Sequence, residues 1–443
     1  MVMTTRCSNT IIFITILTVC AACAYCQNTS YKYSPDAKQT IYLSGVPHID
    51  TTGKTITEYR TGKSFFPILL YHATDFLDAA ETIPTPFDKL RKAGFNGVHT
   101  TAFTKSGMTR AYMDRLHKYG LRMVKCVAEE KEVKQFAKHP AMLAWDVIDE
   151  PDSLGDFDQY PSRFGYYNKH LKMIRDYDKI HPVFVNNVAW ILDPNLVWWT
   201  KWQQTGDIAC HDNYPRGPTT PDSWSKNIGI PESVSLAVKV TDEKKPVWFI
   251  AQAFSEDKPN RWAMPTPVEL RSMVYTAIIH GATAIDYFVM DNDIVRGAGL
   301  YGISPEPREQ YTAGSGVTAD AARLTQIKEL WDTASTINKE IKDLTPWILS
   351  ATTSADYHIY IRGESKTAAP IRTILKYWKG KYLLLAVNID NAAIDTRVEF
   401  ESKLHVKSVE AMYEKRKNLT LTDSTFTDNF KPFEVHIYSF RAK

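Results

Sequence analysis

The feature that most constrains the fold is a regular alternation of short apolar runs with longer amphipathic stretches. Eight apolar runs can be counted in the first three quarters of the chain, and they lie at 65–71, 97–101, 122–127, 143–148, 183–186, 208–211, 247–251 and 284–288. The segments between them have helical periodicity, as at 87–93, 111–119, 166–180, 234–240 and 267–279. Strands that alternate with helices in this way predict a parallel sheet covered by helices.

Eight such units over roughly 280 residues match the usual size of a (β/α)8 TIM barrel. The predicted strands are apolar with little alternation, as expected for strands that are buried on both faces. We therefore predict an α/β fold built on a (β/α)8 barrel.

The pattern changes in the last quarter of the chain. We expect a long helix over 321–342 to complete the barrel, and Pro346 to interrupt the helical pattern. Short runs with a period of two follow at 357–362, 371–377, 382–387, 396–400 and 434–440. These runs predict a small all-β sandwich. The expected domains are a signal peptide at 1–24, an N-terminal strand segment at 25–60, the barrel at 61–346 and the sandwich at 347–443.

The first residues are typical of a secretory leader. Arg6 precedes an almost continuous apolar stretch at 11–22, and Ala22-Cys23-Ala24 has the small-x-small pattern of a cleavage site. The stretch is short for a membrane span. We expect an exported protein (secreted, periplasmic or lipid-anchored through Cys20 or Cys23), with no transmembrane span in the mature chain.

Composition excludes several classes of partner and cofactor. The chain is 44% hydrophobic and 23% charged, its formal net charge is +3, and no long basic block occurs, so no nucleic-acid partner is expected. Outside the leader, Cys126 and Cys210 lie in apolar runs and are interpreted as buried thiols. No Cys/His spacing or Gly-rich phosphate loop predicts a metal or a cofactor. The sequence does not predict an oligomeric state.

The richest cluster of polar residues ends the fourth predicted strand. In a (β/α)8 barrel the chemistry takes place at the carboxyl ends of the strands. Here Trp145 lies in the strand, and the strand ends in Asp149-Glu150-Pro151. A glycosidase needs one carboxylic acid to protonate the leaving oxygen and a second group to attack or to activate water. Glu150 is the candidate acid/base, and Asp149 and Trp145 are candidate substrate-binding residues.

Other strand ends supply further candidates. The sixth strand is followed by Asp212, a candidate second catalytic carboxylate, and by Tyr214, a candidate donor to a sugar hydroxyl. The seventh ends at Gln252, whose amide can hold a hydroxyl but cannot act as a nucleophile. The remaining substrate-binding candidates at strand ends are Tyr71, His99 and Asp286.

These motifs resemble those of the clan A glycoside hydrolases, a group of retaining barrel glycosidases. The resemblance covers roughly 64–290 and is most specific in His139-Pro140-Ala141-Met142-Leu143-Ala144-Trp145-Asp146, which leads to Asp149-Glu150-Pro151. It implies a (β/α)8 fold, a carbohydrate substrate and Glu150 as the general acid/base. Clan A enzymes carry a nucleophilic Glu at the end of the seventh strand, where this sequence has Gln252.

That departure leaves three interpretations open. In the first, Asp212 or Asp286 is the second catalytic carboxylate; a separation of about 5 Å from Glu150 would predict retention and about 6.5–9.5 Å inversion. In the second, the substrate supplies its own nucleophile, because Asp149-Glu150 resembles the Asp-Glu pair of hexosaminidases, in which Asp orients a 2-acetamido group. In the third, the barrel binds saccharides without cleaving them. An adhesion protein that works through its sandwich is a further alternative from another class.

Overall fold

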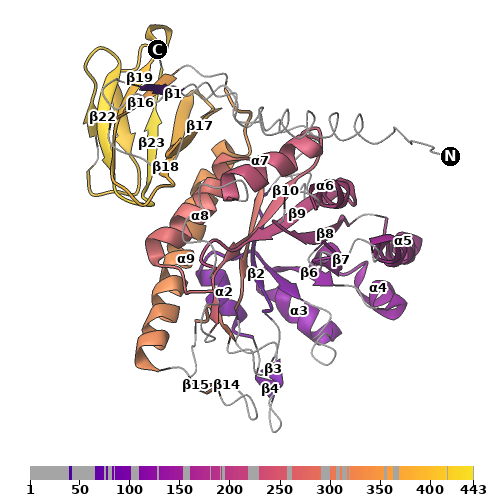
Figure 1. Cartoon of the computed structure of the whole chain (residues 1–443). Helices are drawn as coiled ribbons and strands as arrows, with labels where there is room; N and C mark the ends of the chain where they lie inside the picture. Colours follow the sequence, from indigo (N-terminus) through magenta and orange to yellow (C-terminus); the bar gives the residue numbers. More distant parts are fainter. Residues whose placement is uncertain are drawn as a thin grey trace, which may run out of the picture.

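In the computed structural model, most of the two domains can be described residue by residue. The described residues are 65–73, 85–100, 109–126, 129–152, 160–179, 181–189, 191, 195–217, 229–256, 262–290, 300–305, 320–353, 357–362, 369–416 and 418–442, with the short strands 39–41, 76–77, 82–83, 310–311 and 317–318. The predicted leader at 1–24 lies outside them. Figure 1 shows a barrel with a smaller β domain beside it.

The barrel is closed by eight parallel strands, which confirms the predicted fold. All eight predicted apolar runs form barrel strands, and the last of them pairs with the first. In order around the barrel the strands are β2 (Ile68–Tyr71), β5 (Gly97–Thr100), β6 (Arg122–Cys126), β7 (Met142–Asp149), β8 (Val183–Val188), β9 (Ile208–Asn213), β10 (Val247–Gln252) and β12 (Ala284–Phe288).

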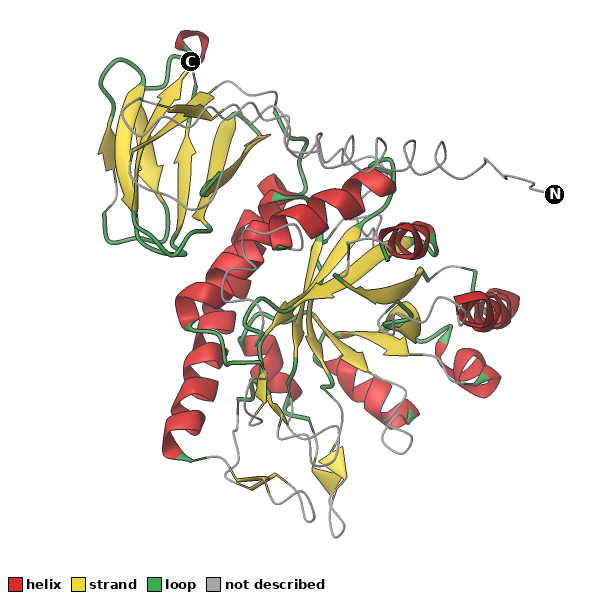
Figure 2. Cartoon of the chain, in the orientation of Figure 1, coloured by secondary structure: helices red, strands yellow, loops and turns green. Residues whose placement is uncertain are grey.

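Helices surround the strands, as Figure 2 shows. They are α2 (Phe87–Lys92), α3 (Arg110–Lys118), α4 (Glu130–Phe136), α5 (Tyr160–Tyr177), α6 (Leu196–Gln204), α7 (Ile230–Val240), α8 (Pro267–Ile279) and α9 (Ala321–Ile348). Local sequence explains their starts. At α8, for example, Thr266 caps the helix and accepts from the backbone N–H of Glu269, whose side chain accepts from Thr266 in return. Pro267 follows at the first helical position, where its missing N–H costs nothing.

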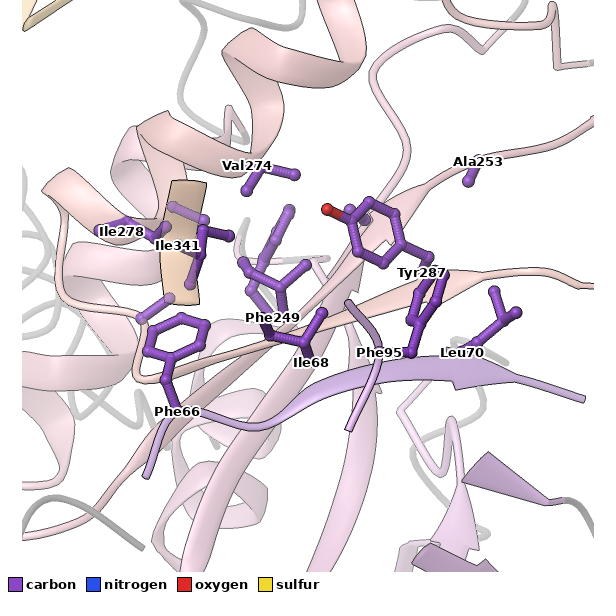
Figure 3. Close-up of a cluster of buried hydrophobic side chains, with 14 of the residues drawn as sticks. Phe66, Ile68, Leu70, Phe95, Phe249, Ala253, Val274, Ile278, Tyr287 and Ile341 are labelled. Atoms are coloured by element: carbon purple, nitrogen blue, oxygen red, sulfur yellow. The ribbon is translucent and has the colours of Figure 1, made fainter. Parts of the chain in front are cut away.

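Most barrel strands contribute side chains to two separate apolar clusters. Outward-facing residues such as Ile68, Phe249 and Tyr287 pack against α8 and α9, as the close-up in Figure 3 shows. Their neighbours in the chain point into the barrel, where Phe184 and Trp248 belong to a second apolar cluster. This double burial accounts for the nearly continuous apolar character of the strand sequences.

The C-terminal domain is a sandwich of two antiparallel sheets. One sheet has the order β17 (Ile371–Trp378), β18 (Lys381–Asn388), β23 (Val435–Phe440), β20 (Ser408–Ala411) and β21 (Asn418–Thr420). The other has the order β1 (Gln39–Ile41), β16 (Tyr357–Arg362), β19 (Ile394–Phe400) and β22 (Thr425–Phe430). The N-terminal strand β1 therefore pairs with the C-terminal domain, antiparallel to β16.

The end of α9 differs from the sequence-based expectation. The helix continues past the expected end at residue 342 and past Pro346, to Ile348. Leu344 and Ile348 are fully buried, and this packing outweighs the loss of one hydrogen bond at Pro346 in the last turn. The apolar core of the barrel also continues into the sandwich through Ile374 and Leu383. The two domains thus share one core at α8 and α9.

Three two-stranded antiparallel sheets lie outside the barrel and the sandwich. They are β3 (Phe76–Leu77) with β4 (Thr82–Ile83), β11 (Ser255–Glu256) with β13 (Leu300–Tyr301), and β14 (Gln310–Tyr311) with β15 (Val317–Thr318). Among the described helices, none has the length and apolar composition needed to cross a bilayer.

Candidate active site

The polar side chains of the candidate site occupy one register of the barrel interior. Along each strand, every second side chain points inward. The inward positions are apolar at the amino ends of the strands and polar near the carboxyl ends. Six polar residues share this inward register and are at most 3% exposed, namely His99, Asp146, Asn186, Asp212, Gln252 and Asp286. Asp146 and Asn186 were not singled out in the sequence, although their register is the same.

Asp149 joins this set because of an irregularity in β7. Asp146 pairs with Phe184 of β8, but Asp149 pairs with Asn186, so β7 holds one more residue than its neighbour over this span. A bulge of this kind reverses the direction of the side chains that follow it. Without it, Asp149 would point outward, opposite to Asp146. With it, Asp149 is exposed at the mouth of the barrel.

Asp149 is held through one of its two carboxyl oxygens. Its Oδ1 accepts from Asn186 Nδ2 at 3.0 Å and from the Tyr71 hydroxyl at 3.5 Å. The side chain is exposed at the mouth, but its carboxyl group is surrounded by protein atoms. This desolvation is the main cause that raises the pKa of Asp149 to about 7, and the negative charges of Asp146 and Glu150 raise it further.

Glu150 follows directly, in an unusual backbone conformation. Its φ is 42°, a region that residues other than glycine seldom adopt, and its N–H donates to the Asn186 carbonyl at 2.8 Å. Such conformations occur preferentially at functional sites. The turn places the half-buried Glu150 side chain beside Asp212 of β9, and the two carboxyl groups share a hydrogen bond.

Asp212 is the buried partner of this pair. It is 3% exposed, and Asn186 Nδ2 also approaches it at 3.4 Å. Burial, together with the charge of Glu150 and the hydrogen bond to it, raises the pKa of Asp212 far above its ordinary value. Asp212 also hydrogen-bonds Tyr214. The predicted role of Asp212 as a second catalytic carboxylate stays a prediction.

A buried ion triad lies beneath these carboxyl groups. His99 Nδ1 is 2.7 Å from Asp286 Oδ2, and His99 Nε2 is 3.3 Å from Asp146 Oδ2. Burial opposes a charge on His99, but the hydrogen bonds to both aspartates prevail and raise its pKa to about 9. His99 is therefore an imidazolium at neutral pH. Both of its nitrogens are engaged, and its ring packs 3.9 Å from that of Tyr71.

The side chain of Gln252 is engaged by backbone groups. Its Oε1 accepts from the Arg216 N–H at 2.9 Å, and its Nε2 donates to the carbonyls of Ala263 at 3.0 Å and of Phe254 at 3.3 Å. The amide is fully buried. It ties together the segments that follow β9 and β10. Its predicted contact with substrate stays a prediction.

Trp145 does not belong to the mouth, which corrects one sequence-based expectation. It has the opposite register to Asp146, so its fully buried ring packs among the residues between the barrel and the outer helices. Its Nε1 donates to Asp178 at 2.9 Å. A fully buried indole on that side of the strand has no access to a substrate at the mouth.

An aromatic wall borders the mouth. Phe288, at the end of β12, contacts the rings of Tyr71 at 5.1 Å, Phe254 at 5.1 Å and Tyr214 at 5.7 Å between centroids. Trp262 extends the wall from Phe254 at 5.7 Å. Tyr214, Trp262 and Phe288 are partly exposed. The site therefore combines hydrogen-bonding carboxyl groups with flat apolar surfaces.

Among the described residues, no group of three or more His, Cys, Asp or Glu side chains is arranged to hold a metal ion. The chemistry that this arrangement can perform is proton transfer between carboxyl groups and a bound ligand, next to aromatic faces on which a ring can stack.

Comparison with known proteins supports the fold. No protein family matches the sequence, and no curated protein matches it. Among solved structures, a glycoside hydrolase of family 5 from Bacteroides vulgatus is 15% identical, with 89% of this chain and 92% of that chain covered and a TM-score of 0.50. An α-amylase from Anoxybacillus is 10% identical, with 85% and 98% covered and a TM-score of 0.50. At such identities the likeness shows a shared fold.

The buried carboxyl groups make the stability of the protein dependent on pH. Asp152, at the end of the β7 segment, is fully buried and accepts from the Val188 N–H at 3.1 Å. Burial raises its pKa from 3.8 to about 8. The folded state therefore favours the proton, and this contribution to stability is lost as the pH rises toward 8. The pKa of His99, raised to about 9, acts in the same direction.

We expect the melting temperature to fall between pH 6.5 and pH 8, and to fall less in an Asp152→Asn variant, which keeps the acceptor oxygen but cannot ionise. The difference in the free energy of unfolding between the variant and the wild type should grow by at most about 1 kcal/mol per pH unit. The exposed Asp176, paired with Lys172 on α5, gives a control in Asp176→Asn. If the melting temperatures of the wild type and of Asp152→Asn fell by the same amount between pH 6.5 and pH 8, the prediction would be contradicted.

Proposed function

We propose that the chain is an exported glycoside hydrolase that cleaves O-glycosidic bonds of an oligo- or polysaccharide, with Glu150 as the general acid/base. The observation that carries the proposal is the placement of Glu150. It stands at the carboxyl end of the fourth barrel strand, beside Asp149 and hydrogen-bonded to Asp212, and it shares the mouth with the aromatic wall. This is the position at which barrel enzymes place their chemistry.

The surroundings of Glu150 suit an acid/base. A general acid needs a proton at the moment when the leaving oxygen develops charge, and a general base must take it back. Asp212, whose pKa is raised far above its ordinary value, shares a hydrogen bond with Glu150. The two carboxyl groups can therefore exchange a proton. Glycoside hydrolases are also found among the solved structures of similar fold, which supports a carbohydrate substrate.

The test is a screen of the purified protein against plant, microbial and host polysaccharides and aryl glycosides, with a Glu150→Gln variant alongside. Hydrolysis that disappears in the variant would support the proposal and identify the substrate class. Hydrolysis that is unchanged would show that another residue is the acid.

A second candidate, a saccharide-binding protein on a barrel scaffold, is favoured by one observation. Gln252 stands where the related barrel enzymes carry a nucleophile, and its amide is engaged by backbone groups. Binding of glycans with no turnover, by wild type and Glu150→Gln alike, would favour this candidate.

Export rests on the leader at 1–24 and is part of the proposal. Expression of the full chain, followed by fractionation and N-terminal sequencing, tests it. A mature protein outside the cytoplasm that begins near residue 25 is expected, and a cytoplasmic protein that retains residues 1–24 would contradict export.

A further inference from the structure

Asn186 lies among the carboxyl groups of the candidate site, and its contacts indicate what it does there; the inference rests on the proposed function. It points into the barrel from β8 and is 2% exposed. Its Nδ2 donates to Asp149 Oδ1 at 3.0 Å and approaches Asp212 Oδ2 at 3.4 Å. A single amide nitrogen therefore links a carboxyl group at the end of β7 to one in β9.

The main chain of Asn186 holds the third carboxyl residue. Its carbonyl accepts from the Glu150 N–H at 2.8 Å, and Glu150 has a positive φ of 42°. A conformation of this kind persists only where the surrounding structure enforces it. Asn186 also pairs with Asp149 at the irregularity of β7. The turn that presents Glu150 to the mouth is therefore fixed against Asn186.

The orientation of the Asn186 amide follows from its neighbours. Its Oδ1 accepts from Cys210 Sγ at 3.9 Å. Burial raises the pKa of the Cys210 thiol far above its ordinary value, so the thiol keeps its proton and can donate. The opposite orientation would set the amide oxygen against two carboxyl oxygens. The N–H end of the amide therefore faces Asp149 and Asp212.

We propose that Asn186 is a positioning residue for the reaction: its amide holds the Asp149 carboxylate at the mouth, and its carbonyl holds the turn that presents Glu150. Asn186 is itself buried, so it acts through these carboxyl groups and not on the substrate. A hydrogen bond to the ionised form of a carboxyl group favours that form, and the bond from Asn186 accordingly lowers the pKa of Asp149 against the effect of burial. An ionised Asp149 can accept from sugar hydroxyl groups with both oxygens.

Asp149 also has titratable neighbours, which come from several barrel strands. Burial raises its pKa first, the acidic groups of β7 raise it further, and the charge of His99 lowers it. Among the described residues, the titratable groups that interact with Asp149 are Asp146 and Glu150 of the β7 segment, Tyr71 of β2, His99 of β5, and Asp212 and Tyr214 of the β9 segment. Asn186 is the neutral donor in this set, so its removal changes no charge.

The experiment compares alanine substitutions at two adjacent asparagines of β8. Asn187 is fully buried like Asn186 but has the opposite register, and its Nδ2 donates to the carbonyls of Cys210 at 3.0 Å and of Val185 at 3.3 Å. Asn186→Ala and Asn187→Ala remove the same atoms and keep the main chain of β8. Only Asn186→Ala removes the donor to Asp149. Asn186→Asp keeps the shape of the side chain and replaces the donor by a carboxyl oxygen, which provides a second variant if the alanine variant folds poorly.

Two readouts are measured for the wild type and the three variants. The first is the pKa of Asp149, from carbon NMR of protein labelled at the aspartate carboxyl carbons, with Asp149→Asn to assign the signal. This readout needs no substrate. The second is the pH profile of kcat/KM on the substrate that the glycan screen identifies.

We expect the pKa of Asp149 to rise by about one pH unit in Asn186→Ala and further in Asn186→Asp, because a carboxylate that loses its donor favours the proton. In Asn187→Ala it should change by less than about 0.3 pH unit. The acidic limb of the pH profile should move upward with the pKa, and kcat should fall about tenfold or more in Asn186→Ala.

An unchanged pKa of Asp149 in Asn186→Ala and Asn186→Asp, or an equal rise in Asn187→Ala, would overturn the inference, whether or not the protein hydrolyses glycosides. A rise confined to the Asn186 variants, in a protein that hydrolyses nothing in the screen, would instead overturn the proposed function and support Asn186 as the residue that positions Asp149. A rise of the pKa in an active enzyme whose pH profile does not move would overturn the role of Asn186 in the reaction.

Discussion

The Glu150→Gln variant is expected to lose activity in proportion to the basicity of the leaving group. On unactivated glycosides the loss should be about a hundredfold to ten-thousandfold, the usual contribution of a general acid. On 2,4-dinitrophenyl glycosides, whose leaving group departs without a proton, the first step should change little. The measurement is kcat/KM across a series of aryl glycosides of graded leaving-group pKa, for wild type and variant.

This dependence distinguishes an acid from a residue that only shapes the site. Glu150 shares a hydrogen bond with Asp212, so its replacement also alters packing. Such damage would lower kcat/KM on all substrates by a similar factor. Glu329, exposed on α9, provides the matched control in Glu329→Gln. A uniform loss across the series, with the slope unchanged, would mean that Glu150 is not the proton donor.

The barrel could be predicted from the sequence because its determinants are local. Each strand is a short apolar run next to an amphipathic helix, and the closed order β2 to β12 follows the chain. The sandwich was harder to predict. In β22, for instance, Phe426 and Phe430 are buried while most of the other side chains are polar, so the strand has no continuous apolar signal. The pairing of β1 with β16 joins segments more than three hundred residues apart, for which no local pattern exists.

The candidate site could be predicted in part. Asp212, Gln252 and Asp286 stand out because each interrupts or ends an apolar run. Asp146 could have been found by the same reasoning, since alternate residues of a barrel strand face the interior.

The position of Asp149 could not be predicted. A period of two places it opposite to Asp146, and only the extra residue in β7 turns it to the mouth. Bulges depend on pairing with the neighbouring strand, here with Asn186 of β8, and therefore on tertiary structure. The contacts of Gln252 with backbone groups are also a tertiary feature, since the sequence shows the amide but not its partners.

The Gln252→Glu substitution, which would place a carboxyl group at the end of the seventh barrel strand, is expected to destabilise the protein and to add no activity. The Nε2 of Gln252 donates to the carbonyls of Phe254 and Ala263. An ionised glutamate would set negative charge against both carbonyls, and a protonated one would satisfy a single carbonyl. A buried polar group that loses its partner costs about 1–3 kcal/mol, so we expect a loss of about 3 kcal/mol. The melting temperature should fall by roughly 3–5 °C.

The same chemical change at an exposed amide isolates this effect. Gln204 on α6 donates to the Val240 carbonyl at 2.9 Å from an exposed side chain, and water can replace that bond, so Gln204→Glu should change stability by about 0.5 kcal/mol or less. Calorimetry and guanidinium denaturation of wild type and both variants provide the comparison. If Gln252→Glu kept the wild-type melting temperature and hydrolysed 2-hydroxy glycosides, the side chain would be free to reach the mouth. A carboxyl group at position 252 would then be sufficient to serve as the second catalytic group beside Glu150.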